Sequence, residues 1–488
     1  MSRTGASMTM NAVVIGVILT VTAVGIIGGQ SQTTGNFFDY IKGQSQDLQD
    51  QWPGSDGQNG NTNNNGNNNN NDNDDTEDAA DNDNLGSPIP SSSSCTGASE
   101  SLSACFGIEP NLYQGHVGNT VPIDIAFDSG SEVDLNIGGQ SVGYTANVTV
   151  IDGNGDGRVV VMFNSWEAGR TGNAITAQAS GDSVVLEQET TLDSRLEPAD
   201  YPLQLRNSSD DSLLDLGTLS LQDMEVGPMR VYRMRDDASP SNVEQLNDAI
   251  YEGSTIAKSD KLVLNITVSS IYSFFKGKDD FGVGGVHFQA KEQDPEMNTD
   301  PEIVTSNALD KVFRRPLTSR VFLVLETDTA AFAPNDDDDG SDTFKANFSI
   351  TSTNAYVSSG EMREVREPFH VVDGPSSTSL SLPTNDEGTH YVENSASYTI
   401  SGSTAYAPGT QLALYIRSTQ GYPYLLNTGD ENAKMPVTAD GTFQTTLDLS
   451  QLQPKGPGDE TTKLRVEIRR DGNVIKEFYP VLVQNSGG

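Results

Sequence analysis

Hydrophobic and polar residues alternate one by one through most of the chain from residue 106 onward. The segment VPIDIAFD, residues 121–128, places four apolar side chains on one face and Asp124 and Asp128 on the other. The same period of two recurs at 144–150, 262–268, 344–350 and 464–468. Successive side chains of a strand point to opposite faces, so this period predicts β-strands with one buried face.

One segment departs from the period of two and predicts a helix. In SPSNVEQLNDAIYEG, residues 239–253, Ser241 and Glu244 have the spacing of a capping box, and Gly253 can end the helix. Three apolar residues share one face of this helix: Val243, Leu246 and Ile250.

The predicted strands fall into three segments of sandwich size. Gly, Asp, Asn and Pro interrupt them at short intervals, which is typical of β-sandwiches. We place Ig-like domains at residues 106–224, 225–373 and 374–488, and the run DGPSS at 373–377 marks the last boundary. The predicted fold class is therefore all-β, with about three tandem Ig-like β-sandwiches.

The N-terminal region contains an uncharged apolar run at residues 8–29, long enough for one membrane span. Arg3 is the only charge before it, which places residues 1–7 in the cytoplasm and the remainder outside. A cleaved signal peptide competes with this interpretation, although no clean small-x-small cleavage site follows the run. A pilin-like N-terminus is a third alternative, but no basic residue directly precedes the run. We predict an uncleaved transmembrane signal anchor.

Residues 30–105 form a juxtamembrane segment and a linker rich in Asn, Asp and Ser. This composition offers little to bury, so the linker is expected to be disordered and to hold the folded part away from the membrane. Cys95 and Cys105, the two cysteines of the chain, lie close together at its end. Outside the cell a disulfide would close a small loop there, and the alternative is two unpaired thiols.

Acidic residues outnumber basic ones 68 to 29, which gives a net charge of −39. The acids continue through the strand-rich regions, and in ordinary salt their repulsion would oppose compaction. At about 1 M salt the Debye length shrinks to about 3 Å and screens this repulsion. The charge therefore predicts a molar-salt environment, and it argues against nucleic acid or anionic lipid headgroups as partners.

Four sequons for N-glycosylation lie in the predicted sandwiches, at Asn147, Asn207, Asn265 and Asn347. Three of them fall within predicted strands, with the Asn on the polar face, so a glycan would point to solvent. The alternative is that Asn and Thr simply suit the outer faces of strands.

The segment VIDGNGDGRVVVMFN, residues 150–164, begins like a calcium loop, with oxygen side chains at Asp152, Asn154 and Asp156. An EF-hand is excluded, because Phe163 stands where the bidentate Glu is needed and a strand follows in place of a helix. Two interpretations remain. One is a hairpin turn whose glycines permit positive φ, and the other is a turn that also binds Ca²⁺ or Mg²⁺.

Motifs for catalysis are missing from the sequence. The four histidines are scattered, and the chain contains no zinc-binding spacing, P-loop, nucleophile elbow or dinucleotide fingerprint. We predict no catalytic residue and no enzyme activity. Trp166 is expected to pack within its own sandwich.

Longer segments resemble a known family. The first domain contains LYQGHVGNTV and LEPADYPLQL, the second GPMRVYRMRDDAS and SDKLVLNITVSSIYSFF, and the third SGSTAYAPGTQLALYIRS and VTADGTFQTTLDLS. Their order resembles the Ig-like domains of haloarchaeal surface proteins, the S-layer glycoproteins and their relatives. The resemblance implies an extracellular, glycosylated array of β-sandwiches without catalytic activity.

The expected function combines this resemblance with the predicted topology. It is that of a membrane-tethered surface glycoprotein of an extreme halophile, with an S-layer-like structural or adhesive role at the cell surface. Family members often carry a Thr-rich stalk and a hydrophobic C-terminal anchor, whereas this chain has its predicted stalk and anchor at the N-terminus. A virion spike or a filament subunit built from the same domains is therefore the alternative. Expected partners are the membrane and other surface proteins or further copies of the chain.

Overall fold

The computed structural model describes most of the chain beyond residue 103. The described residues are 95, 103–108, 110–170, 173–295, 297–329, 332, 341–418, 425–427, 434–450 and 462–484. The predicted N-terminus at 1–7, the predicted span at 8–29 and most of the predicted linker at 30–105 lie outside them. Within the described ranges, no helix has the length and apolar character needed to cross a membrane.

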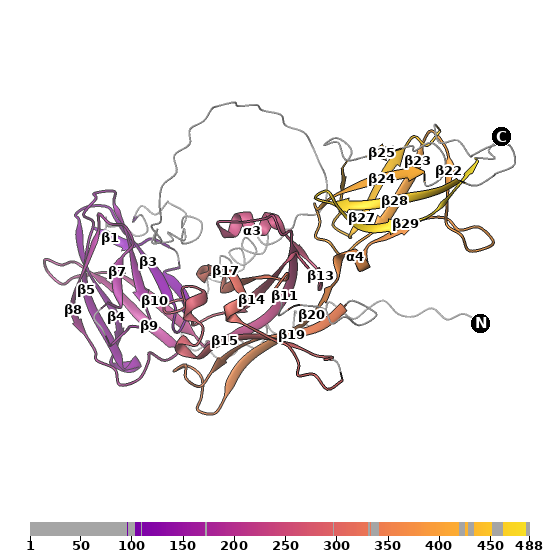
Figure 1. Cartoon of the computed structure of the whole chain (residues 1–488). Coiled ribbons are helices and arrows are strands. Elements are labelled where there is room, and N and C mark those ends of the chain that lie inside the picture. The colour runs from indigo at the N-terminus through magenta and orange to yellow at the C-terminus, as the bar shows by residue number, and fades with distance from the viewer. Residues whose placement is uncertain are drawn as a thin grey trace, which may run out of the picture. The chain divides into compact units, whose positions relative to one another are not determined.

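The first ten strands form two sheets, with the orders β1-β3-β6-β7 and β2-β10-β9-β4-β5-β8 (Figure 1). Apolar side chains from both sheets, such as Ile123 and Leu135, share one buried cluster, so the two sheets make a sandwich. The strands are β1 Ala104–Phe106, β2 Leu112–His116, β3 Thr120–Phe127, β4 Glu132–Gly139, β5 Tyr144–Ile151, β6 Arg158–Asn164, β7 Ile175–Ala177, β8 Ser183–Glu189, β9 Ala199–Arg206 and β10 Leu213–Gln222.

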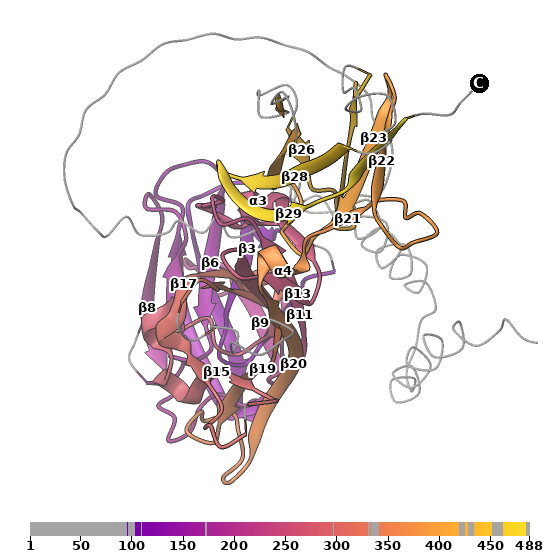
Figure 2. The same ribbon diagram turned by 45° about the vertical axis from the view of Figure 1, so that its right-hand side comes forward.

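The next ten strands form a second sandwich, with the sheet orders β12-β11-β14-β18-β17 and β13-β20-β19-β15-β16. Leu264 from one sheet and Phe348 from the other lie in the same core. Figure 2 shows β15, β19 and β20 as neighbours. The strands are β11 Val226–Met234, β12 Ile250–Glu252, β13 Thr255–Ala257, β14 Lys261–Val268, β15 Val286–Glu292, β16 Ile303–Thr305, β17 Leu309–Arg315, β18 Arg320–Glu326, β19 Ser341–Thr351 and β20 Met362–Val372.

The last ten strands form a third sandwich, in which β21-β23-β27 faces a sheet built on β22-β30-β28-β24-β25. Ile400 and Leu414, from opposite sheets, share its core. The strands are β21 Ser379–Ser381, β22 Tyr391–Asn394, β23 Tyr398–Ser403, β24 Gln411–Ser418, β25 Leu425–Asn427, β26 Met435–Pro436, β27 Thr442–Leu447, β28 Thr462–Arg470, β29 Asn473–Phe478 and β30 Val481–Gln484.

The three sandwiches share one feature of topology. In each, an early strand pairs in parallel with the last strand: β2 with β10, β13 with β20 and β22 with β30. The other strand pairs within the described residues are antiparallel. Across the residues that the structure describes, the prediction of an all-β fold is confirmed.

The predicted helix is α3, which spans Val243–Ala249. Its cap differs from the prediction by one residue. Asn242 is the N-cap, and its side chain accepts a hydrogen bond from the Gln245 N–H at 2.9 Å. Ser241 precedes this N-cap, and its backbone N–H donates a hydrogen bond to the Gln245 side-chain oxygen at 2.9 Å. The run at 373–377 forms the short helix α4, Gly374–Ser377, capped by Asp373.

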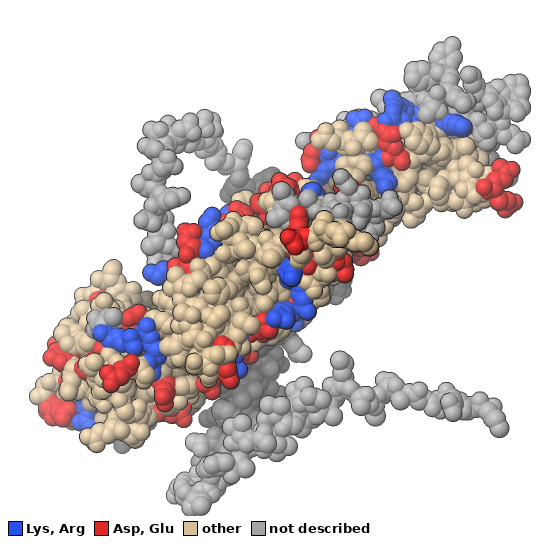
Figure 3. Space-filling model, turned by 60° about the horizontal axis from the view of Figure 1, so that its bottom comes forward, with Lys and Arg blue, Asp and Glu red and all other residues tan. Residues whose placement is uncertain are grey.

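One acid on a predicted polar face is buried. As predicted, Asp124 is on the face of β3 that points away from the core, but its side chain is only 3% exposed. Arg158 on the neighbouring strand β6 donates to both of its carboxylate oxygens, at 2.7 and 3.1 Å. A charged pair therefore covers this part of the outer face. Elsewhere, acidic and basic side chains form small scattered groups between wide uncharged areas, as Figure 3 shows for one face.

Candidate functional surfaces

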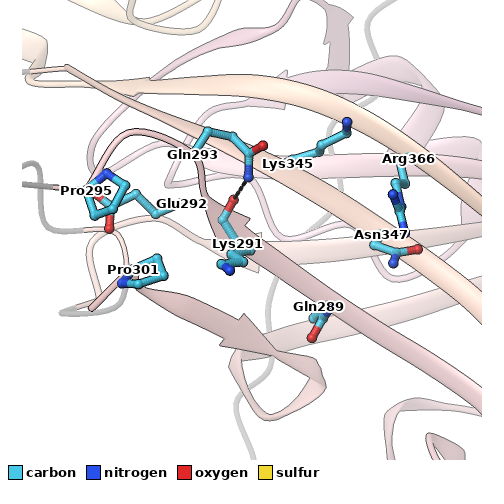
Figure 4. Close-up of a pocket in the computed structure, with 9 residues that line it drawn as sticks. All are labelled: Gln289, Lys291, Glu292, Gln293, Pro295, Pro301, Lys345, Asn347 and Arg366. Atoms are coloured by element: carbon cyan, nitrogen blue, oxygen red, sulfur yellow. Dashed lines mark hydrogen bonds between the residues drawn. The ribbon is translucent and has the colours of Figure 1, made fainter. Parts of the chain in front are cut away.

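A pocket of 470 Å³ lies on the outer face of the second sandwich (Figure 4). The inward residues of β15, such as Phe288, fill the core, so the alternate residues Gln289 and Lys291 face outward. Strand register sets Asn347 of β19 between Gln289 and Arg366 of β20. The pocket is thus lined from three adjacent strands.

The chemistry of this pocket is cationic and rich in hydrogen-bond donors. Lys291 and Lys345 are cross-strand neighbours. Neither has an ion-pair partner among the described residues, although acids greatly outnumber bases in this chain. Arg366 pairs with Glu364 at 2.9 Å. The loop that follows β15 makes the opposite wall, where the Gln293 side chain donates to the Lys291 carbonyl at 2.9 Å.

Three of the four predicted glycosylation residues are partly exposed. Asn147 lies on the outer face of its sheet, between Asn136 and Gln188 on the adjacent strands. Asn207 follows β9 in a turn, where its side-chain oxygen accepts from the Ser209 N–H at 2.9 Å. The third, Asn347, lines the pocket described above.

The fourth, Asn265, is covered. It lies on the outer face of β14 as predicted, yet it is only 8% exposed. A second apolar cluster occupies this outer face and joins Leu246 of α3 to Val263 and Phe322. The prediction that a glycan on Asn265 would point to solvent is therefore wrong for the folded chain.

The loop at Asp152 is closed by its own hydrogen bonds. Asp152 is 6% exposed, and its two carboxylate oxygens accept from the N–H groups of Gly155 at 2.7 Å and Gly157 at 2.9 Å. Both glycines have positive φ, 72° and 80°, which few other residues adopt without strain. The buried carboxylate thus shapes the hairpin between β5 and β6.

The other two predicted ligands serve the same turn. Asn154 accepts from the Asp156 N–H at 2.8 Å, and Asp156 accepts from the Arg158 N–H at 2.9 Å. In the part of the chain that the structure describes, no three His, Cys, Asp or Glu side chains are placed to hold a metal ion together. The geometry supports the hairpin-turn interpretation of this segment.

We expect Asp152→Ala to lower the free energy of unfolding of the first sandwich by about 1–3 kcal/mol, because two backbone N–H groups lose their acceptor. Asp156→Ala, at an exposed position, is the control and should change it by less than about 0.5 kcal/mol. Thermal unfolding in molar NaCl measures both. A chelator should leave the wild-type melting temperature unchanged, and a clear drop would instead mean that the loop binds a cation.

Cys95 and Cys105 are joined by a disulfide, with their Cα atoms 5.5 Å apart. Cys105 belongs to β1, which pairs with β3, so the bond attaches the end of the linker region to the first sandwich.

An aromatic cluster joins the first two sandwiches. The Trp166 ring lies 4.4 Å from that of Phe274 and 5.8 Å from that of Tyr356, both in the second sandwich. The Arg195 guanidinium stacks over Trp166 at 3.9 Å. The expectation that Trp166 packs within its own sandwich is wrong, because the loop after β6 carries it across the boundary.

A buried ionic joint connects the second and third sandwiches. Asp260, which follows β13, is fully buried, and its carboxylate accepts from the Ala407 N–H at 2.6 Å. Arg470, at the end of β28, approaches Asp260 at 3.5 Å and pairs with Asp236 at 2.6 Å. The same guanidinium lies 4.5 Å above the Tyr406 ring. Burial raises the pKa of Asp260 to about 7, although Arg470 opposes this increase.

Two arginines, one in β11 and one directly after it, add further hydrogen bonds to this joint. Arg233 donates to the carbonyls of Ala405 and Ala439 at 3.4 and 3.1 Å, and Arg235 donates to the Gly409 carbonyl at 3.4 Å. Sequence patterns gave no sign of the joint or of the pocket, since both depend on strands far apart in the chain.

Comparison with known proteins gives three kinds of match. A family model described as a domain of unknown function (DUF7827) matches residues 99–208. A cell surface glycoprotein of Haloferax gibbonsii is 26% identical over 69% of this chain and 40% of its own length. Cell surface glycoproteins 2 and 1 of Haloarcula hispanica are 23% and 20% identical, over 72% and 78% of this chain and 42% and 45% of their own.

A solved marsupial T cell receptor aligns over 75% of this chain and 96% of its own, at 12% identity and a TM-score of 0.18. This TM-score is too low to support a fold assignment, so the assignment of β-sandwiches comes from the sheet topology. The chain spans less than half the length of the curated relatives it matches. Those matches agree with the resemblance seen in the sequence: the chain is similar to haloarchaeal cell surface glycoproteins over 69–78% of its length.

Proposed function

We propose that this chain is a membrane-tethered extracellular glycoprotein of an extreme halophile, with an S-layer-like structural or adhesive role. The observation that carries the proposal is the similarity to haloarchaeal cell surface glycoproteins over 69–78% of the chain. The net charge of −39 supports it, since a molar-salt medium would screen the repulsion.

The architecture suits a structural role. Three Ig-like sandwiches would offer several surfaces for contact with further copies and with other surface proteins. Trp166 packs between the first and second sandwiches, and the Asp260–Arg470 pair connects the second and third. These contacts would limit motion between the sandwiches and let them act as a spacer. Residues 8–29 would anchor it and residues 30–105 would separate it from the membrane. No catalytic role is proposed.

We further propose that Asn147, Asn207 and Asn347 carry glycans and that Asn265 does not. The first three are partly exposed, whereas Asn265 is 8% exposed. Glycopeptide mass spectrometry on protein from a glycosylating halophilic host tests this. A fully occupied Asn265 would contradict the assignment.

The alternative is a virion or filament component, and fractionation separates it from the favoured role. The chain would be tagged at its C-terminus and followed through envelope, particle and filament fractions in molar salt. Sedimentation with cell envelopes supports the surface protein. Recovery with virus-like particles or filaments would move the role to those structures.

A further inference from the structure

We propose that the pocket on the outer face of the second sandwich is a saccharide-binding site, and that its occupant is the glycan attached to Asn347 itself. This inference rests on the proposed glycosylation and adds a role for one glycan: it packs on the sandwich and stabilises it.

The attachment atom is held in place. Asn347 Nδ2 donates one hydrogen to Glu364 at 3.2 Å. A side-chain amide carries two hydrogens, so the linkage to a sugar replaces the other and leaves this bond intact. Glu364 is in turn fixed by Arg366. The first sugar would therefore start from a fixed point on the wall of the pocket.

The lining offers the donors that sugar oxygens require. Gln289, Lys291 and Lys345 present amide and ammonium groups to the pocket, and neither lysine is paired with an acid among the described residues.

The volume of the pocket and the covalent attachment at Asn347 both agree with a glycan as the occupant. The 470 Å³ volume lies within the range of about 300–1,000 Å³ that is usual for small-molecule sites. Because the glycan is covalently attached to a lining residue, its effective concentration at the pocket is on the order of millimolar. Individually weak contacts are then enough to keep it bound.

A cycle of two substitutions tests the contact. Lys345→Ala would be made in the glycosylated chain and again with Asn347→Gln, which removes the sequon. We expect Lys345→Ala to lower the melting temperature by at least about 2 °C in the glycosylated chain and to have no effect without the glycan. Equal shifts in the two backgrounds would overturn the inference. The same cycle with Asn147→Gln, at a sequon outside this pocket, is the control, and there the Lys345→Ala shift should persist.

A second measurement needs no change in stability. Periodate oxidation of the glycans in the wild-type chain, followed by mass spectrometry, compares two sites in the same molecule. The glycan at Asn347 should react several-fold more slowly than that at Asn147, and Lys345→Ala should remove the difference. Equal rates in the wild type would overturn the inference. If Asn147 and Asn207 carry glycans and Asn347 does not, this inference fails while the proposed surface function stands.

Discussion

Arg470→Ala is expected to lower the free energy of unfolding of the third sandwich by about 1–3 kcal/mol at neutral pH. The change removes the pairing with Asp236 and the cation that opposes the raised pKa of the fully buried Asp260. It also removes the guanidinium stacked on Tyr406. Denaturant unfolding in molar NaCl measures the loss. Because the joint is buried, molar salt should reduce the effect far less than it would for a surface pair.

The control for this prediction is Arg230→Ala. Arg230 pairs with Glu252 at 3.8 Å, and both side chains are more than half exposed, so its removal should cost less than about 1 kcal/mol. A loss of stability that is equal in the two variants would contradict a buried ionic joint. The cost of Arg470→Ala should shrink as pH falls below about 7, because Asp260 is then protonated and needs no cationic partner.

The joint should also give the chain an unusual dependence on pH. Burial raises the pKa of Asp260 to about 7, from its ordinary 3.8. Between these values the folded chain binds a proton that the unfolded chain releases. The stability from this group is therefore fully present below about pH 4 and is lost as pH rises through about 7. The slope cannot exceed about 1.4 kcal/mol per pH unit.

Asp260→Asn isolates this contribution, because the amide oxygen still accepts from the Ala407 N–H but does not titrate. The other carboxylates are common to both proteins. We expect the free energy of unfolding of the wild type, relative to Asp260→Asn, to decrease as pH rises from about 4 to about 7. A difference that stays constant or increases over this range would show that Asp260 is ionised in the folded chain.

Local patterns in the sequence predicted the local structure well. The alternation at 121–128 and 262–268 identified β3 and β14, since the period of two follows directly from strand geometry. The helix was also predicted, although Asn242 and not Ser241 is its N-cap. Adjacent polar residues compete for that position, and only the backbone conformation decides between them.

Features that depend on pairing between strands far apart in the sequence could not be predicted. Asp124 has the spacing of an exposed residue, but Arg158, 34 residues further on, covers it. Asn265 is buried on an outer face of its sheet where α3 packs an apolar cluster onto neighbouring residues. Lys291, Lys345 and Arg366 come together through the register of three strands, which no short segment encodes. The same holds for the contact of Arg470 with Asp260.

The measurement that tests the central claim most directly is protease treatment of intact cells in molar salt, with a tag at the C-terminus. A tethered surface protein predicts that the sandwiches are released into the medium as a large tagged fragment, while the N-terminal segment stays with the membrane. A chain that remains fully protected until the cells are broken would contradict the account.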